Sequence, residues 1–185
     1  MDVHRAITSR RAYRSLKPVS ITKRLISDLA QHAQLAPSCF NNQPWRFVFV
    51  YGARALKKMH EALSSGNEWA QAASMIIAVC SRRQDDCIIR DREYYQFDTG
   101  LGVAFLILRA TELGLVAHPI AGFSPKKTRQ ILNIPEEYQV ITLIIVGKHS
   151  DKISPVLSQN QREAEKKRPK RIPLKKFVFL NHFSN

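Results

Sequence analysis

Hydrophobic residues follow two patterns along the chain. One is the spacing of a helix, and the other is the short continuous run typical of a buried strand. Three short apolar runs predict strands at residues 47–51, 75–80 and 140–146. The run at 75–80 is apolar throughout, which is typical of a strand buried on both faces. A long apolar helix is predicted from about residue 94 to 113, ended by Gly114. Such a helix, apolar all round, belongs in the middle of a fold.

Shorter helical patterns surround these elements. They predict helices at residues 3–8, 21–36, 53–63 and 125–132. Ser20 is the expected N-cap of the second of these, and Ser124 precedes a first-turn proline in the last. Helices therefore alternate with strands, without the regular order of a parallel βαβ protein.

The C-terminal part of the chain has a different character. Residues 148–176 are polar and basic with three prolines, and they are expected to run irregularly over the surface. A strand-like piece at 177–181 follows, and it could pair with the sheet edge of a partner. No repeat or second boundary is visible, so residues 1–185 are expected to form one domain that includes this arm.

Composition limits the classes of protein that the chain can represent. Hydrophobic residues make up 44% and charged residues 24%, values of a soluble globular protein. No apolar run reaches the roughly 18 residues of a membrane span, and no signal-peptide core is visible. The three cysteines contain no CxxC pair, and Asp85 and Asp86 have no evident partner carboxylates. We therefore expect a cytoplasmic protein with neither a disulfide framework nor a metal site.

The net charge of +14 is concentrated at the two ends. Residues 1–24 hold seven Lys/Arg against one acid, and residues 162–176 hold eight against two, so each end carries +6. The two ends can be solvated tails, or they can converge on an anionic ligand. The sequence leaves both interpretations open.

The loop at residues 36–47 is the most informative segment. Pro37 and Pro44 prevent the preceding helix from continuing through it. Between them stand Ser38 and the consecutive amides at 41–43, and Trp45 follows as a core residue. Such a loop can offer donors and acceptors to a polar, planar ligand.

Arg10, Arg11 and Arg14 lie within five residues near the N-terminus. Guanidinium groups bind phosphate in a bidentate manner and stay charged at any relevant pH. A solvated basic face is the alternative to a phosphate site.

Four motifs occur in the order found in the nitroreductase family of FMN enzymes, and the chain resembles that family from Arg10 to Arg171. They resemble RRSxRxF at the N-terminus, PSxxNxQPWxF in the amide loop, P-I-x-G-F at 119–123 and R-x-P-L at 171–174. The resemblance implies cofactor contacts from Arg10, Arg11, Ala12, Arg14, Pro37, Ser38, Asn41, Gln43, Pro119, Ile120, Ala121, Gly122 and Arg171. It also implies a substrate pocket lined by Phe40, Asn67, Trp69 and Phe123.

The same resemblance implies roles for some of these residues. Arg10 and Arg171 would hold the FMN phosphate, and Arg14 would reach the ring near N1 and O2. The backbone at Gly122 would face N5 and O4, while the amide loop would reach the FMN of the opposite subunit. Ala12 replaces the family's serine, so one hydroxyl contact to phosphate would be missing.

An α+β fold is implied as well: a three-layer sandwich with a central mixed, mostly antiparallel sheet flanked by helices. The chain would form a homodimer with FMN at the subunit interface, its C-terminal strand exchanged with the dimer partner. NADH or NADPH would give a hydride to flavin N5, and a small flat acceptor, a nitroaromatic or quinone, would then enter the same pocket. This ping-pong scheme needs no catalytic side chain, because the flavin carries the chemistry.

Two other function classes stay open from the sequence. A flavin-binding protein without turnover would share the same motifs. A nucleic-acid-binding protein would fit a pI of about 10.1, but aromatic residues interleave poorly with the basic runs. Neither nucleic acid nor a membrane is expected as a partner.

Overall fold

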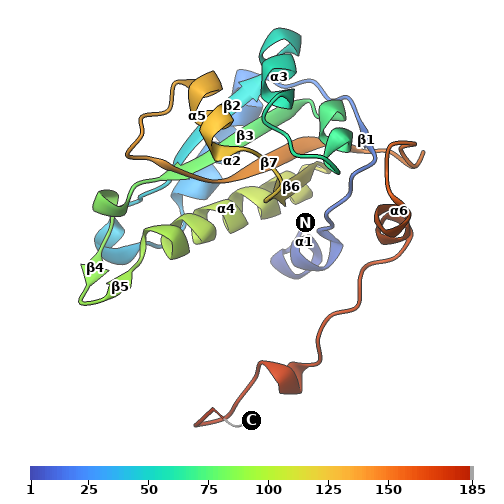
Figure 1. The fold of residues 1–185 in the computed structure, drawn as a ribbon. Coiled ribbons are helices and arrows are strands. Elements are labelled where there is room, and N and C mark those ends of the chain that lie inside the picture. Colours follow the sequence, from blue (N-terminus) through green and yellow to red (C-terminus); the bar gives the residue numbers. More distant parts are fainter. Residues whose placement is uncertain (184–185) are drawn as a thin grey trace.

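An antiparallel sheet forms the centre of the computed structural model, which describes residues 1–183 (Figure 1). Its long strand β7 (Gln139–His149) pairs with β3 (Met75–Ser81), β6 (Val116–Ile120) and β1 (Leu16–Lys17). The strand β2 (Arg46–Tyr51) pairs with the other edge of β3. The predicted strands at 47–51, 75–80 and 140–146 are thus confirmed, and every pairing among them is antiparallel.

Two layers of helices cover the sheet, one on each face. Alternate residues of β3 explain this, since Ile76 and Ala78 join one hydrophobic core, while Ile77 and Val79 join the other. The first core includes α3 (Ala53–His60) and packs against α5 (Pro125–Leu132). The second is closed by α2 (Lys23–Gln34) and the long α4 (Tyr95–Glu112). The α+β three-layer fold is confirmed.

Local signals set most boundaries of the helices. The helix α1 (Val3–Ser9) begins after Asp2, and α5 begins after Ser124, whose hydroxyl accepts the N–H of Lys127. The N-cap of α2 is Thr22, which accepts the N–H of Leu25, so the expectation of Ser20 was wrong by two residues.

The strand β6 runs through Pro119. Proline has no N–H to donate to a sheet, so it is tolerated where one side of a strand is unpaired. The only strand that pairs with β6 among residues 1–183 is β7. Pro119 therefore lies in an edge strand.

Short elements complete the connections between these strands and helices. They are the 3-10 helices η1 (Cys39–Asn41), η2 (Glu68–Ala72), η3 (Arg83–Asp85) and η4 (Leu174–Lys176), and the hairpin strands β4 (Ile88–Ile89) and β5 (Arg92–Glu93).

A disulfide between Cys39 and Cys87 corrects the expectation that the cysteines stay unpaired. The two residues are 48 positions apart, so only the fold brings them together. Their spacing in the sequence carries no sign of this.

The C-terminal region differs from its prediction in one way. Residues 148–176 are not irregular throughout, because α6 (Gln159–Lys166) forms behind a capping box of Ser158 and Gln161. The segment 177–181 pairs with no strand within residues 1–183, since it runs away from the sheet (Figure 1). Its pairing with the sheet edge of a partner stays a prediction, because a strand needs a hydrogen-bonded neighbour.

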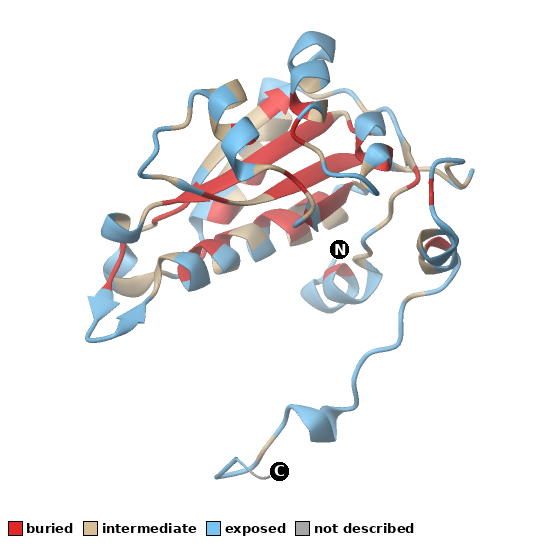
Figure 2. Cartoon of the chain, viewed as in Figure 1, coloured by how far each residue is buried: buried red, intermediate tan, exposed pale blue. Residues whose placement is uncertain are grey.

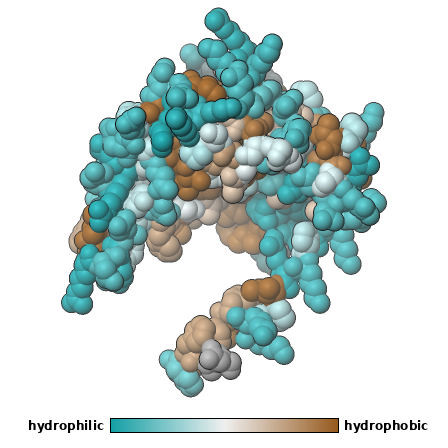
Figure 3. Space-filling model, viewed as in Figure 1, coloured by the Kyte–Doolittle hydropathy of each residue, from teal (hydrophilic) through white to brown (hydrophobic). Residues whose placement is uncertain are grey.

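The segment 167–183, called the C-terminal arm below, exposes unusual amounts of apolar surface. Figure 2 shows it exposed over nearly its whole length, and Figure 3 shows its apolar side chains separated from the body. Leu180 is 79% exposed, Phe183 76% and Leu174 70%. Monomeric soluble proteins rarely leave a contiguous apolar segment so open.

Candidate functional site

Three arginines from the two ends of the chain converge. Arg168 donates from Nη2 to the backbone oxygens of Thr8 (2.6 Å) and Arg10 (2.9 Å). Burial and the nearby charges of Arg168 and Arg171 lower the pKa of Arg10. A cluster of like charges creates a positive potential that an anion would relieve. The two basic ends therefore meet, as one of the two interpretations of the sequence required.

The helix α6 holds the arginine segment in place through Glu165. Its buried carboxylate accepts the N–H of Arg14 at Oε1 (2.7 Å) and that of Ser15 at Oε2 (3.0 Å). Arg11 donates from Nη2 to the backbone oxygens of Ala164 (2.6 Å) and Glu165 (3.2 Å). The guanidinium of Arg11 is thus occupied by the end of α6, whereas the resemblance assigned it to a cofactor.

A group of stacked side chains lies beside this segment. The indole of Trp69 stacks on the imidazole of His118 with 4.8 Å between ring centroids, and the Arg14 guanidinium lies 5.7 Å from the Trp69 ring. His118 Nδ1 lies 3.1 Å from the backbone oxygen of Tyr13. A carbonyl can only accept, so Nδ1 carries the proton. Burial lowers the pKa of His118 to about 4, so its imidazole is neutral near neutral pH.

Gly122 joins the same group through Asn67. The Asn67 amide donates to the Gly122 backbone oxygen (3.0 Å), and its own oxygen accepts from Trp69 Nε1 (3.2 Å). A Cβ at Gly122 would overlap Asn67 Nδ2. The absence of a side chain therefore allows the close approach of these two segments.

The predicted residues of 119–123 point in different directions. Pro119 and Ala121 are exposed, while Ile120 and Phe123 are buried in the core. Phe123 packs with Trp69 in the first hydrophobic core, so both are less open to a substrate than the sequence suggested. Their part in a pocket would be to support its floor.

The amide loop is held in an unusual backbone conformation. Phe40, Asn41 and Gln43 have φ values of 48°, 59° and 50°, in the left-handed region that few residues other than glycine adopt. The hydroxyl of Ser38 accepts the N–H of Gln43 (3.0 Å), and the Gln43 side chain donates to the Asn41 oxygens. Local hydrogen bonds thus hold the loop in this strained conformation, which would not persist without them.

The loop does not meet the arginine segment in this chain. No hydrogen bond in residues 1–183 connects residues 37–45 with 10–15, 67–69 or 118–123. Phe40, predicted to line the pocket, is 85% exposed on the loop instead. Pro37 and Ala12 are also exposed. The structure therefore brings three of the four motifs together and keeps the amide loop apart.

Glu165 is the site residue that the sequence analysis missed. A capping box at Ser158 and Gln161 predicts a helix over this segment, and that signal was available in the sequence. The sequence carries no signal for the contact of Glu165 with Ser15, which lies 150 positions away.

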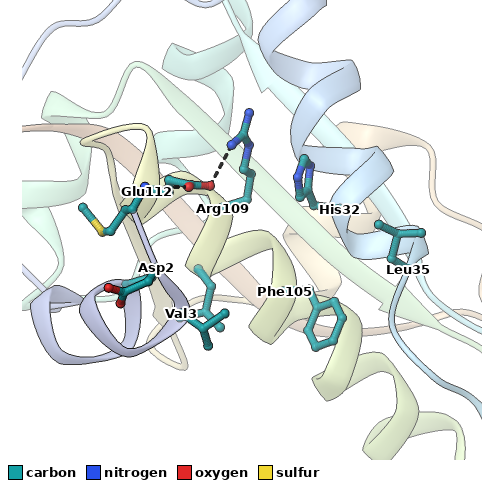
Figure 4. A pocket seen from close by; sticks show the side chains of 10 residues that line it. Asp2, Val3, His32, Leu35, Phe105, Arg109 and Glu112 are labelled. Atoms are coloured by element: carbon teal, nitrogen blue, oxygen red, sulfur yellow. Dashed lines mark hydrogen bonds and ion pairs between the residues drawn. The ribbon is translucent and has the colours of Figure 1, made fainter.

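An apolar cavity of about 380 Å³ lies elsewhere, between α1, α2 and α4 (Figure 4). Val3, Leu35 and Phe105 line it, and Arg109 pairs with Glu112 at its edge (2.7 Å). The exposed apolar side chains around it, which include Val3 at 70% and Leu35 at 73%, form the apolar helical face. The guanidinium of Arg109 at this cavity is already paired, with Asp28 and with Glu112.

Comparisons with known proteins agree on one family. The model described as the nitroreductase family matches residues 7–74 and 64–148. A protein of Archaeoglobus fulgidus, provisionally named NADH dehydrogenase/NAD(P)H nitroreductase, is 30% identical over 152 residues, covering 78% of this chain and 84% of the relative. The NADH dehydrogenase of Thermus thermophilus is 23% identical over 180 residues, covering 80% and 86% respectively.

Solved structures share the fold. A structure described as an oxidoreductase containing FMN superposes with a TM-score of 0.86 at 28% identity, covering all of this chain and 94% of that one. A protein of Exiguobacterium sibiricum, provisionally described as a nitroreductase in complex with FMN, has a TM-score of 0.78 at 21% identity and covers 98% of both chains. No helix in residues 1–183 has the length and apolarity needed to span a membrane.

Proposed function

Because the chain belongs to the nitroreductase family, we propose that it is an FMN-dependent oxidoreductase that passes hydride equivalents from NAD(P)H to a flat oxidised acceptor. Bound FMN would supply the redox chemistry, taking a hydride at N5 and delivering it to the acceptor. NAD(P)H as the donor and a nitro compound as the acceptor follow the names of the relatives. A quinone is the second flat acceptor in the proposal. The nicotinamide donor also favours a cytoplasmic setting.

The convergence of Arg10, Arg168 and Arg171 is the observation that carries this proposal. Burial and the charges of Arg168 and Arg171 lower the pKa of Arg10, so an anion would stabilise the cluster. Guanidinium groups favour bidentate contacts to phosphate. We therefore assign Arg10 and Arg171 to the FMN phosphate. Arg168 would hold Arg10 in place through its hydrogen bond to the Arg10 backbone oxygen. Arg11, which binds the end of α6, would fix the position of residues 10–14.

The residues beside this cluster fit a planar ring. Gly122 leaves its backbone open to close approach, and Arg14 brings a positive charge next to Trp69. His118 holds the Tyr13 backbone oxygen, which fixes the segment between Arg10 and Arg14. In the proposal these groups orient the ring and stabilise negative charge at its edge, and no side chain has to transfer a proton.

A homodimer would complete the site. The amide loop, with Ser38, Asn41 and Gln43, is preorganised yet reaches no other motif in its own chain. The C-terminal arm and the apolar helical face leave large apolar side chains exposed, and each such side chain gains about 1.5–3 kcal/mol on burial. We propose that the arm packs on a second copy and that each loop completes the partner's FMN site.

Cofactor retention tests the assignment of the arginines. The purified protein should be yellow, and Arg10→Ala or Arg171→Ala should raise the Kd for FMN about 10- to 150-fold, the loss of one charged hydrogen bond. Arg54→Ala, at an exposed position on α3, is the matched control and should leave the Kd unchanged. A protein that neither contains nor takes up FMN would contradict the proposal.

Turnover separates the enzyme from a flavin-binding protein without activity. Initial rates with NADPH or NADH and a quinone should give parallel double-reciprocal lines, the pattern of a ping-pong scheme. Binding of FMN without oxidation of either nicotinamide would favour the non-catalytic alternative.

Oligomeric state tests the dimer. Deletion of residues 174–185 leaves Arg168 and Arg171 in place but removes the exposed apolar end of the arm. We expect the full chain to sediment as a dimer, and the deletion to dissociate at concentrations where the full chain does not. Identical sedimentation at every concentration would exclude the arm from the interface.

A further inference from the structure

Two cysteines and two aspartates meet where the amide loop contacts the chain before α4. Cys39 and Cys87 form the disulfide, with their Cα atoms 6.0 Å apart. A carboxylate oxygen of Asp86 and the two sulfur atoms all lie within 4.8 Å of one another. Asp98, on α4, accepts the backbone N–H of Cys39 at 2.6 Å. The cluster lies outside the group around Arg10 and Gly122.

Both carboxylates are buried without a cation. Asp86 is 8% exposed and Asp98 is 3% exposed. Neither forms an ion pair with Lys, Arg or His in the part of the chain that the structure describes, whereas the neighbouring Asp85 pairs with Arg82 and Arg46. A buried pair of carboxylates favours a proton or a metal cation between them.

One oxygen of Asp86 is left without a partner. Its Oδ1 accepts the N–H of Cys87 (2.8 Å) and the side-chain amide of Asn42 (3.3 Å). Its Oδ2 is buried and accepts no hydrogen bond from a donor within residues 1–183, and the Asp98 carboxyl lies beside Asp86. Buried polar atoms are nearly always satisfied, so a cation or a shared proton belongs between the two carboxyls.

We propose that Cys39, Cys87 and Asp86 form a thiol-dependent zinc site, closed while the disulfide is present and open to Zn²⁺ once it is reduced. A dithiol reductant gives two electrons and two protons to the Cys39–Cys87 bond, which breaks into two thiols, and the reductant becomes a disulfide. Zn²⁺ then displaces both thiol protons and binds two sulfurs and one Asp86 oxygen.

The chemistry of these ligands selects the metal. Thiolate sulfur prefers Zn²⁺ over Mg²⁺ or Ca²⁺, and zinc accepts mixed sulfur and oxygen ligands in tetrahedral geometry. Three protein ligands leave the fourth position to water. Asp98 holds the Cys39 backbone and faces Asp86, as residues behind a metal ligand commonly do. Cys39 and Asp98 also line a surface hollow of about 500 Å³, which gives an ion a path to the site.

Zinc content measured by elemental analysis tests the site without using activity or FMN. Protein treated with a phosphine reductant, incubated with zinc and desalted anaerobically should retain one zinc per chain, and the oxidised protein should retain none. Substitution by Co²⁺ should produce a thiolate-to-cobalt charge-transfer band in the difference spectrum. The Cys39→Ser/Cys87→Ser variant should lose the zinc, and Asp86→Asn should weaken binding at least 10-fold.

Cys80→Ser is the matched control, because Cys80 is a buried free thiol in β3 whose pKa burial raises to about 11. It should retain zinc like the parent. Reduced parent protein that retains no zinc, or a Cys39→Ser/Cys87→Ser variant that retains as much as the parent, would overturn the proposal. If the Cys39→Ser/Cys87→Ser variant fails to fold, Asp86→Asn tests the site instead, and an unchanged zinc affinity of Asp86→Asn would also overturn the proposal. Neither result depends on whether FMN binds.

Discussion

Acid should destabilise this protein through His118 in a way that a surface histidine would not. The imidazole is 7% exposed, stacks on Trp69, and donates from Nδ1 to the Tyr13 oxygen. A second proton would place a charge in this buried position, next to Arg14 and Arg10. Burial first, and then these two charges, lower its pKa from 6.5 to about 4.

The sign follows from comparing the folded and unfolded chains. Above pH about 6.5 both keep His118 neutral, and stability is at its full value. Between pH about 6.5 and about 4 the unfolded chain binds a proton that the folded chain does not, so stability falls as the pH is lowered. The whole pKa difference corresponds to about 3 kcal/mol, of which about 2.5 kcal/mol is lost by pH about 4.5.

Urea unfolding from pH about 7 to about 4.5, at one protein concentration, measures this loss. His118→Asn removes the titration but keeps an N–H donor near the position of Nδ1. Other groups titrate in both proteins, so the difference between them isolates His118. The parent should lose about 2.5 kcal/mol more than His118→Asn over this range. His4→Asn, at an exposed position, should follow the parent. Parallel curves for the parent and His118→Asn would refute the reasoning.

Two further substitutions test the supports of the site. In the parent, the Glu165 carboxylate accepts the N–H groups of Arg14 and Ser15, and Glu165→Gln places an amide NH₂ against one of them. The free energy of unfolding in urea should therefore fall by about 1–3 kcal/mol. Glu163→Gln, on the exposed side of the same helix, should be nearly neutral, and equal losses would show that the buried contacts are unimportant. Gly122→Ala pushes against the Asn67 amide and should lower FMN affinity at least 10-fold in a fluorescence titration. Gly100→Ala is the control, because a Cβ there meets nothing within 4 Å, and it should leave the FMN affinity unchanged. If Gly122→Ala also leaves the affinity unchanged, the flavin does not approach the Gly122 backbone closely.

The sequence predicted those features that depend on short-range pattern. The apolar runs at 75–80 and 140–146 indicated buried strands, and β3 and β7 confirm them. The matching positive charge of the two ends allowed two interpretations, and the contact of Arg168 with Arg10 agrees with the one in which the ends meet. The strand predictions succeeded because periodicity acts locally. The long apolar helix does not lie in the middle of the chain's fold, because its outer side leaves Phe97 and Phe105 exposed.

Features that rest on a few distant contacts were missed. The disulfide and the Asp86–Asp98 pair depend on how the amide loop packs against α4, and no spacing encodes that. The left-handed backbone of Phe40 is likewise imposed by the loop, since a phenylalanine does not favour it. The C-terminal strand stays a prediction, because an apolar sequence becomes a strand only where a neighbour is present.

The contact between Arg168 and the Arg10 backbone has a consequence for biosynthesis. The N-terminal segment leaves the ribosome first. Arg168, which contacts the Arg10 backbone, is synthesised 158 residues later. The sheet can close once β7 has emerged, but the arginine cluster cannot form until Arg168 and Arg171 have left the exit tunnel. Cofactor uptake would then follow the closing of the sheet. Chains that end prematurely after β7 would reach a folded body and still be unable to hold FMN.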